Sequence, residues 1–308
     1  MAAGAQQYPA GTLYVVATPI GNLADLTLRA IHVLALVDAV ACEDTRVAST
    51  LLAYLGLHKP LLAAHEHNER EAAVAIVERL RRGERIALVS DAGTPAVSDP
   101  GARIVADVAG SGARVVPVPG ASAAIAAASV AGVVSIDGGF RFAGFAPAKG
   151  AARREVIGQL AREAMTVVLY ESPHRIGALA IELAAVAPDR VLTIARELTK
   201  QFETIETMPA RELPGWLDAE PKRSRGEFVI VLHPLAPAHA DAPVNDGGRL
   251  LAVLMRELPL KQAVALAAEA TGAPRNALYE QALALRNETR PDGSEPPGGR
   301  TAQDDHGP

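Results

Sequence analysis

The chain has 308 residues, of which 49% are hydrophobic, and carries a formal net charge of -5. This length is sufficient for about two hydrophobic cores, and the acidic balance argues against a protein that coats nucleic acid without specificity. The single cysteine, Cys42, excludes an intramolecular disulfide and a structural zinc site built from thiolates.

Residues 1–10 have neither the basic start nor the apolar stretch of a signal peptide, and we expect them to be disordered. No later apolar run reaches the roughly 18 residues of a membrane span. We therefore expect a cytoplasmic protein with no membrane partner.

From Thr12 onward, short β-rich segments alternate with amphipathic helical segments. The predicted strands are 12–17, 38–44, 60–64, 85–91 and 113–118, and the predicted helices are 27–37, 46–57, 69–82 and 102–110. Such alternation is typical of a mainly parallel sheet with helices on both faces. We predict an α/β lobe at 11–135.

The pattern starts again near Gly138 and Gly139 and predicts a second α/β lobe at 136–233, with the boundary around 134–139. The β-rich segments of this series are 140–148, 166–172, 190–198 and 226–232, and its helical segments are 154–164 and 173–186. The fold class is therefore α/β with two lobes.

A small helical unit follows the second lobe. The segment 234–248 is rich in Pro, Ala and Gly and is predicted to be a linker. In the unit at 249–288, two helices surround a turn at Gly272, the spacing of a helix-turn-helix. The unit either docks on RNA or packs as an ordinary helical hairpin. The polar tail at 289–308 is predicted to be disordered.

Three loops directly follow strands of the first lobe, at 18–27, 90–101 and 119–124. Ligands of open α/β sheets bind outside the carboxyl ends of the strands, and glycines in such loops let backbone approach a ligand. None of the three matches GxxxxGK[ST], and the first is not GxGxxG, so the usual phosphate cradle of a nucleotide is missing.

Acidic side chains gather around the same loops, with little compensating lysine. They are Asp25, Glu43, Asp44, Asp91 and Asp99. Such a rim repels pyrophosphate and attracts a cofactor with a sulfonium and an ammonium group, such as S-adenosylmethionine. The alternative is that Asp25 and Asp99 cap the helices that follow them.

A series of motifs now indicates a family: TPIGNLADLTLRA, CEDTR, SDAGTPAVSDPG, PGASA, LYESPHR, ARELTKQFE and GEFVIV. Together they resemble the tetrapyrrole-methylase superfamily, and within it the bacterial branch that methylates a cytidine 2′-oxygen of 16S ribosomal RNA. The resemblance runs from Gly11 to Leu232 and includes the helical unit. The first loop has fewer glycines than the C-methylating members, which favours the RNA branch.

The resemblance implies a homodimer that binds S-adenosylmethionine in a cleft between the lobes and methylates 16S ribosomal RNA. The chemistry needs no metal, and we expect no DNA partner. Because an acidic protein gains little sequence-independent affinity for RNA, we expect the assembled 30S subunit to be the preferred substrate. The resemblance places cofactor contacts at Pro19, Gly21, Asp91, Ala92, Gly93, Thr94, Pro95, Gly120, Ser122 and Ala123.

Methyl transfer to a hydroxyl needs alignment of the reacting atoms and a group that takes the proton. We select Glu43, Asp44, Arg46 and Lys200 as catalytic candidates, and further candidates are Glu171, His174 and Glu203. These residues have other possible roles. Glu43 and Asp44 could stabilise the start of one helix, and Ser172 and Pro173 could begin another. Lys200 could bind a phosphate.

Two further clusters have ordinary alternatives. His65 and His67 could bind a metal, but HxH between a strand and a helix is more often a polar loop. Two basic clusters are either solvated surface or contacts to RNA phosphates: Lys149 with Arg153 and Arg154, and Lys222 with Arg223 and Arg225. The rival functions are methylation of a tetrapyrrole or other small molecule, and RNA binding without catalysis.

Overall fold

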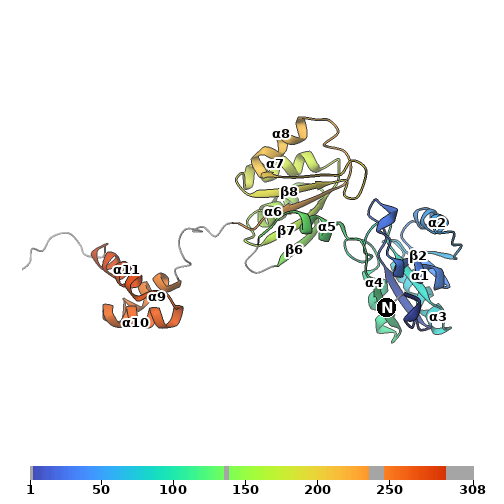
Figure 1. Cartoon of the computed structure of the whole chain (residues 1–308), viewed down its shortest axis with the longest axis horizontal. Coiled ribbons are helices and arrows are strands. Elements are labelled where there is room, and N and C mark those ends of the chain that lie inside the picture. Colours follow the sequence, from blue (N-terminus) through green and yellow to red (C-terminus); the bar gives the residue numbers. More distant parts are fainter. Residues whose placement is uncertain (1–2, 135–138, 236–245, 289–308) are drawn as a thin grey trace, which may run out of the picture. The chain divides into compact units, whose positions relative to one another are not determined.

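The computed structural model describes residues 3–134, 139–235 and 246–288, drawn in colour in Figure 1. The chain forms two compact units, Met1–Leu235 and Ala236–Pro308. Both sheets belong to the first unit. Most of the linker expected at 234–248, and the whole tail expected at 289–308, lie outside the described residues.

The first sheet has five parallel strands in the order β3-β2-β4-β1-β5. They are β1 Thr12–Val16, β2 Ala39–Cys42, β3 Leu61–Ala63, β4 Ile86–Val89 and β5 Arg114–Val118. The order places β1 between β4 and β5. The three loops predicted to hold a ligand therefore leave neighbouring strands at the same edge.

Helices cover both faces of this sheet. They are α1 Leu28–Leu36, α2 Thr45–Tyr54, α3 Glu69–Arg81 and α4 Ala102–Gly110. Because side chains alternate along a strand, Tyr14 packs in the core with α1 and α2, and Leu13 packs in the core with α3 and α4. Burial on both faces explains the continuous apolar sequence of the strands.

The described residues before Gly11, for which the sequence suggests disorder, pack on the first lobe. They include a short 3-10 helix, Ala3–Ala5. The Tyr8 ring lies 4.9 Å from the ring of His32, the Arg85 Nε donates to Tyr8 O at 2.9 Å, and the Tyr14 hydroxyl donates to Pro9 O at 3.1 Å. These contacts fix the chain just ahead of β1.

The second sheet is mixed, with the order β6-β7-β10-β8-β9. Its strands are β6 Phe140–Phe145, β7 Thr166–Glu171, β8 Val191–Arg196, β9 Thr204–Pro209 and β10 Phe228–Leu232. Only β6 and β7 pair in parallel, and the other pairs are antiparallel. The mainly parallel arrangement therefore holds for the first lobe alone.

The two faces of the second sheet are covered by different parts of the chain. One core contains α6 Gly150–Leu160, α7 Ile176–Val186 and α8 Leu213–Asp218. On the other face lies α5 Ala123–Val130, whose Ala127 packs in a core with Val229 of β10. Because α5 already packs on the second sheet, the chain leaves the first sheet at 119–122, before the expected boundary at 134–139.

The second unit contains three helices in its described residues, α9 Asp246–Leu254, α10 Leu260–Thr271 and α11 Arg275–Glu288. They share a core that includes Leu251, Val264 and Leu278. Gly272 has a φ of 69° and ends α10 in the left-handed conformation, at the turn expected there. No helix in the described part of the chain is long and apolar enough to cross a membrane.

Candidate active site

A cavity of about 300 Å³ opens where the first lobe's loops meet the second sheet. The loops after β1, β4 and β5 contribute Ile20, Ala92, Gly93, Thr94, Val97, Ser98, Asp99, Ser122 and Ala123. The second lobe contributes Phe145, Tyr170, Glu171, Ser172, Pro173, Ala195, Leu198, Glu227, Phe228 and Val229. This volume falls at the lower end of the range for small-molecule sites.

Half of the expected cofactor contacts line this cavity: Ala92, Gly93, Thr94, Ser122 and Ala123. The others are in the same loops but do not line it: Pro19, Gly21, Asp91, Pro95 and Gly120. None of the catalytic candidates Glu43, Asp44, Arg46 and Lys200 lines it either.

Hydrogen bonds tie the three loops together. The backbones of Thr18 and Gly93 exchange two bonds, with Thr18 N donating at 2.8 Å and Gly93 N donating at 3.1 Å. The Thr94 hydroxyl donates to Ala121 O at 3.1 Å. Gly93 has a φ of 81°, a conformation that favours glycine, so its backbone lines the cavity without a side chain.

Backbone strain gathers in two loops beside the cavity. Among the described residues, the non-glycine residues with positive φ are Ala96, Ser98, Glu197 and Thr199. The first two are in the loop after β4, and the other two are in the loop after β8. Such conformations cost on the order of 1–3 kcal/mol each and cluster at functional sites. The strain supports a function for both loops.

The lobes meet at these loops, and glycines permit the closest approaches. A Cβ at Gly21 would lie 2.5 Å from Lys200 Cγ, and a Cβ at Gly144 would lie 2.7 Å from Ser98 Oγ. The Ala124 N also donates to the Tyr170 hydroxyl at 3.1 Å, which joins the start of α5 to β7. Gly21 therefore has a packing role that its loop position alone did not indicate.

Acidic groups surround the first lobe's side of the cavity. Burial, followed by the charge of Asp91, raises the pKa of Asp99, although a hydrogen bond with Ser90 opposes the shift. Burial also raises the pKa of Glu43, and the charges of Asp91 and Asp99 add to this effect. A cationic ligand would relieve this repulsion.

The proposed capping roles of Asp25 and Asp99 are wrong. Thr27 caps α1 by accepting a hydrogen bond from Ala30 N, and α4 begins after Gly101 with no side-chain cap. Asp99 instead lines the cavity.

The CEDTR candidates have local partners. Asp44 caps α2 by accepting from Arg46 N, and its carboxylate pairs with the Arg46 guanidinium at 2.6 Å. The side-chain and backbone hydrogen bonds of Arg46 lower the pKa of Asp44 to about 2. Asp44 is therefore a weak base, whereas Glu43 has a raised pKa beside Asp91 and Asp99.

Lys200, in the second lobe, contacts two carboxylates of that lobe. Its Nζ lies 2.9 Å from Glu197 Oε1 and 2.9 Å from Glu227 Oε2. Burial lowers the pKa of Lys200, but the hydrogen bonds to both glutamates outweigh this effect, so its pKa is raised. Lys200 is therefore a cation at neutral pH rather than a base.

Glu171 is fully engaged in a buried network. Its carboxylate accepts from Arg153 Nη2 at 3.1 Å, from Arg175 Nε at 2.6 Å and from Ser172 N at 2.9 Å. Arg153 is 4% exposed, so it is not a contact to RNA phosphates. Nor does Ser172 cap α7, which begins at Ile176 after Arg175.

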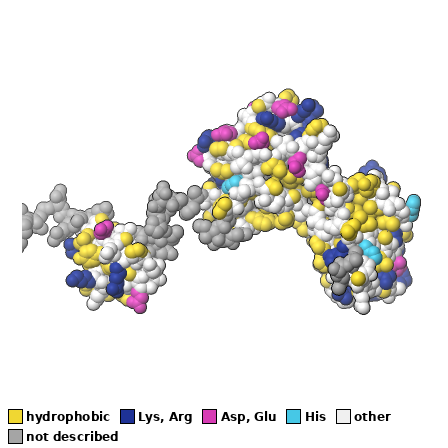
Figure 2. Space-filling model, viewed as in Figure 1, with side chains coloured by type: hydrophobic (Ala, Val, Ile, Leu, Met, Phe, Trp, Pro, Cys, Tyr) yellow, Lys and Arg dark blue, Asp and Glu magenta, His cyan; other side chains and the backbone are white. Residues whose placement is uncertain are grey.

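The rings of His65 and His67 lie 6.1 Å apart. Within the described residues, no group of three or more His, Cys, Asp and Glu side chains could hold a metal ion. Of the second basic cluster, Arg223 lies over the Trp216 ring at 4.6 Å, whereas Lys222 and Arg225 are exposed. On the face shown in Figure 2, Lys and Arg are scattered over the first unit.

The sequence revealed only part of the cavity wall formed by the second lobe. Tyr170, Ala195 and Val229 lie in the motifs LYESPHR, ARELTKQFE and GEFVIV, but they are apolar or aromatic strand residues that no glycine or charge marks as ligand contacts. Their shared position near the ends of β7, β8 and β10 is the signal that could have found them, but it depends on the strand order.

Comparisons with known proteins agree with this arrangement. The family described as Tetrapyrrole (Corrin/Porphyrin) Methylases matches residues 12–214, and the RsmI C-terminal HTH domain matches residues 241–286. The chain is 48% identical to Ribosomal RNA small subunit methyltransferase I of Neisseria meningitidis serogroup B, over 90% of this chain and 94% of that protein. The enzyme of the same name from Escherichia coli O157:H7 is 46% identical, over 89% and 95%.

Solved structures show the same fold. A cobalt precorrin-4 methyltransferase has a TM-score of 0.56 at 20% identity and covers 74% of this chain and 98% of its own. The uroporphyrin-III C-methyltransferase of Thermus thermophilus, complexed with S-adenosyl homocysteine, has a TM-score of 0.51 at 20% identity and covers 71% and 96%. With its two α/β sheets and its helical unit, the chain belongs to the tetrapyrrole methylase family.

Proposed function

We propose that the chain transfers a methyl group from S-adenosylmethionine to the ribose 2′-oxygen of a cytidine in 16S ribosomal RNA. The observation that carries this proposal is the 48% identity with a ribosomal RNA small subunit methyltransferase I over 94% of that protein. The similarity extends through the helical unit. The assignment of cytidine as the target nucleotide, and of its 2′-oxygen as the methyl acceptor, rests on the resemblance of the motifs.

The cavity fits this cofactor in shape and charge. Gly93 and Ala92 present backbone, and Thr94 and Ser122 present hydroxyls. The positive φ of Gly93 favours glycine there and leaves its backbone open to the ligand. The nearby Asp99 suits a cofactor that carries a sulfonium and an ammonium group. Ala195 and Val229 offer apolar surface to its adenine ring.

When bound, the cofactor supplies an electrophilic methyl group. The chain's own residues align the acceptor hydroxyl and accept its proton. Asp99 is the cavity carboxylate whose pKa is raised by burial, which makes its oxygen a stronger base than a solvated aspartate. We propose that an Asp99 carboxylate oxygen takes the proton and that the charge of Asp91 adds to its basicity.

The other candidates act around this centre. The cation of Lys200 holds Glu227 at the wall of the cavity. The Asp44–Arg46 pair fixes the start of α2, next to Asp91, because Asp44 N donates to Asp91 Oδ1 at 3.1 Å. Pro19, Gly21, Asp91, Pro95 and Gly120 shape the loops that present the cofactor contacts.

We further propose that the substrate is the assembled 30S subunit, that the enzyme works as a homodimer and that it is cytoplasmic. A net charge of -5 gives little nonspecific affinity for naked RNA, so a folded particle must provide shape for recognition. Sedimentation of the purified full chain measures the oligomeric state.

The proposed function is tested by incubating the enzyme and labelled S-adenosylmethionine in parallel with unmodified 30S particles, free 16S RNA and a tetrapyrrole. We expect label in the 30S particles, recovered as 2′-O-methylcytidine after digestion. Label in the tetrapyrrole alone would favour small-molecule methylation. RNA binding with no label in any substrate would favour a non-catalytic module.

A further inference from the structure

Strand β6 contains an irregularity that changes which face its last residue occupies. Phe142 pairs with Val168, but Gly144 already pairs with Leu169, and Phe145 pairs with Tyr170. One extra residue, Ala143, is thus inserted in β6, and Gly144 takes a φ of 61°. This is a β-bulge, a feature that often re-aims a side chain near an active site.

The consequence is visible in the aromatic contacts. Phe142 and Phe145 are an odd number of residues apart, so a regular strand would place them on opposite faces. Instead both rings pack edge-on against Tyr170, with centroids 5.0 Å and 5.5 Å away. Ala143 packs on the other side, in the core with α6 and α7. The bulge therefore turns Phe145 towards the cavity that it lines.

The Phe145 ring is held firmly but remains accessible. Tyr170 supports it from β7, and the Arg175 guanidinium lies 6.0 Å from its centroid. Arg175 is itself fixed by Glu171 and by Ala146 O at 3.0 Å. Even so, Phe145 is 54% exposed. A large apolar ring that is both rigid and accessible at a cavity suits stacking on a flat ligand.

We propose that Phe145 stacks on the nucleobase of the methylated nucleotide and so positions its ribose in the cavity. This inference rests on the proposed function. Proteins that recognise single-stranded RNA commonly place bases on aromatic side chains, and such stacking tolerates a splayed-out base. The bulge at Ala143 and Gly144 then has the role of orienting the Phe145 ring towards this base.

The adenine of the cofactor is the other flat group that could meet this ring. The exposure of Phe145 favours the substrate base, because a small cofactor is enclosed by its site whereas RNA must reach the cavity from outside. Ala195 is fully buried and Val229 is 5% exposed, and both offer enclosed apolar surface suited to adenine.

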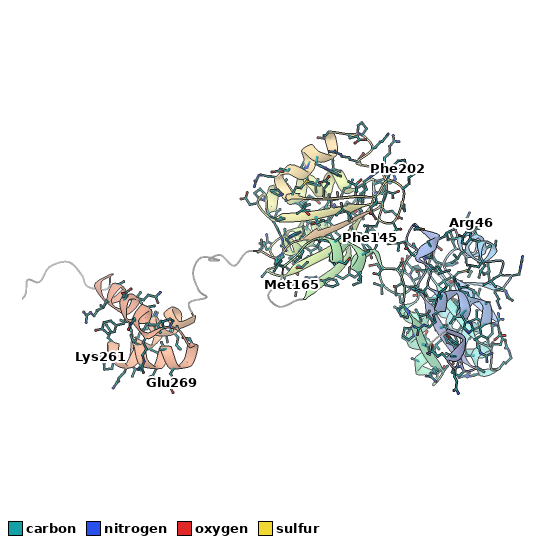
Figure 3. The ribbon with its side chains drawn as sticks, in the orientation of Figure 1. Arg46, Phe145, Met165, Phe202, Lys261 and Glu269 are labelled. Carbon is teal, nitrogen blue, oxygen red and sulfur yellow. The ribbon has the colours of Figure 1, made fainter. Side chains whose placement is uncertain are left out.

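The test compares Phe145→Ala, Phe145→Leu and Phe145→Tyr in the full chain. As a matched control we choose Phe202→Ala, because Phe202 is 70% exposed in the same lobe but does not line the cavity; Figure 3 labels both side chains. Three quantities are measured: kcat/KM for unmodified 30S particles, the Kd for those particles in the presence of S-adenosylhomocysteine, and the calorimetric Kd for S-adenosylhomocysteine alone.

We expect Phe145→Ala and Phe145→Leu to lower kcat/KM by about 10- to 100-fold, with a raised KM and weaker particle binding, while Phe145→Tyr stays within about threefold of wild type. All variants should bind S-adenosylhomocysteine like wild type, and Phe202→Ala should change nothing. Weaker S-adenosylhomocysteine binding by Phe145→Ala would assign the ring to the cofactor and overturn the proposal.

Wild-type kinetics in Phe145→Ala would also overturn the proposal, and full activity in Phe145→Leu would reduce the role to apolar bulk and exclude stacking. These failures are distinct from failure of the proposed function. If the proposed function were wrong, the wild-type enzyme itself would leave 30S particles unlabelled, and the role of Phe145 would be excluded together with that function.

Discussion

Lys200 and Glu227 form an ion pair at the edge of the cavity, with Nζ 2.9 Å from Oε2, and Glu227 lines the cavity wall. Lys200 also pairs with Glu197, which has a strained φ of 52°. The cation thus lies between two carboxylates at the cavity wall and offsets their mutual repulsion.

Replacing Lys200 by alanine should reduce methyl transfer much more than cofactor binding. The two glutamates lose their shared cation on the second lobe's side of the cavity, whereas the hydrogen bonds that Gly93 and Thr94 make with the neighbouring loops do not involve Lys200. We expect the single-turnover rate to fall about tenfold or more, with a change in cofactor Kd of less than about threefold. Arg81→Ala, which removes an exposed cation at the end of α3 outside the cavity, is the control. A wild-type rate in Lys200→Ala would remove Lys200 from the mechanism.

Gly93 and Gly120 should respond differently to substitution. Gly93 lines the cavity at a φ of 81°, so Gly93→Val should abolish cofactor binding. A Cβ at Gly120 would lie 3.0 Å from Ala17 Cβ, so Gly120→Val should chiefly destabilise the fold. Calorimetry and thermal unfolding separate the two effects.

Gly112 provides a control for Gly93, because it has a φ of 82° and a Cβ at this residue would meet no heavy atom within 4 Å. Gly112→Val should carry only the backbone penalty, about 1–2 kcal/mol, and keep cofactor binding. If Gly93→Val binds the cofactor as well as Gly112→Val does, the backbone of Gly93 does not meet the ligand.

Much of the first lobe followed from the sequence because both faces of its parallel sheet are covered, which makes its strands apolar and its helices amphipathic. The second lobe was harder to predict. The segment that forms β10 predicts a strand but not its antiparallel direction, and β9 is an edge strand with exposed Glu206. Helix α5 consists mostly of alanine, so no alternation of apolar and polar residues marks it as an amphipathic helix.

The same reasons limited prediction of the site. The glycine loops around Gly93 and Ser122 have local signals, and both residues line the cavity. The opposite wall depends on which strands are neighbours and on the one-residue bulge before Phe145, neither of which the local sequence determines. Lys200 was selected from its motif, but its partner Glu227 is 27 residues away and only the fold brings them together.

Asp99→Asn should lower activity and raise stability. Burial raises the pKa of Asp99, so its ionised form is disfavoured in the folded protein. Its contribution to stability is present below the unfolded pKa near 3.8 and is lost as pH rises through the folded pKa. At neutral pH, asparagine removes this cost and also removes the proposed base.

We therefore expect Asp99→Asn to unfold at a higher temperature than wild type at neutral pH while its single-turnover rate falls by about 100-fold. Asp107→Asn, at an aspartate of α4 that does not line the cavity, is the control and should change neither quantity. A variant that keeps its rate would exclude Asp99 as the base.

Cys42 should resist thiol reagents in the folded protein. It is 1% exposed, and burial, together with the charges of Asp91 and Asp44, raises the pKa of its thiol to about 11. At pH 8 only about one thiol in a thousand would then be ionised, and the thiolate is the reactive form. Iodoacetamide labelling followed by mass spectrometry should modify Cys42 after unfolding in urea but not before. Rapid labelling of the native protein would contradict this burial.

The helical unit should contribute to recognition of the particle rather than to cofactor binding. It begins after Leu235, where the first compact unit ends, and it has its own core around Leu251 and Leu278. The start of α11 exposes Arg275, Asn276 and Tyr279, which suit contacts to phosphate and to bases.

Deleting the chain after Leu235 should therefore weaken methylation of 30S particles at subsaturating substrate while the calorimetric Kd for the cofactor stays the same. The cavity residues all precede this point, so the truncated enzyme keeps every contact to the cofactor. It loses a docking surface for the particle, and nonspecific attraction between an acidic protein and RNA cannot replace that surface. Arg275→Glu in the full chain should reproduce part of the defect, and Glu269→Lys, on α10, should not. The docking role would be excluded if the truncated enzyme methylates the particles as fast as the full chain, or if naked 16S RNA is the better substrate. The unit would then be an ordinary helical hairpin that takes no part in recognising the particle.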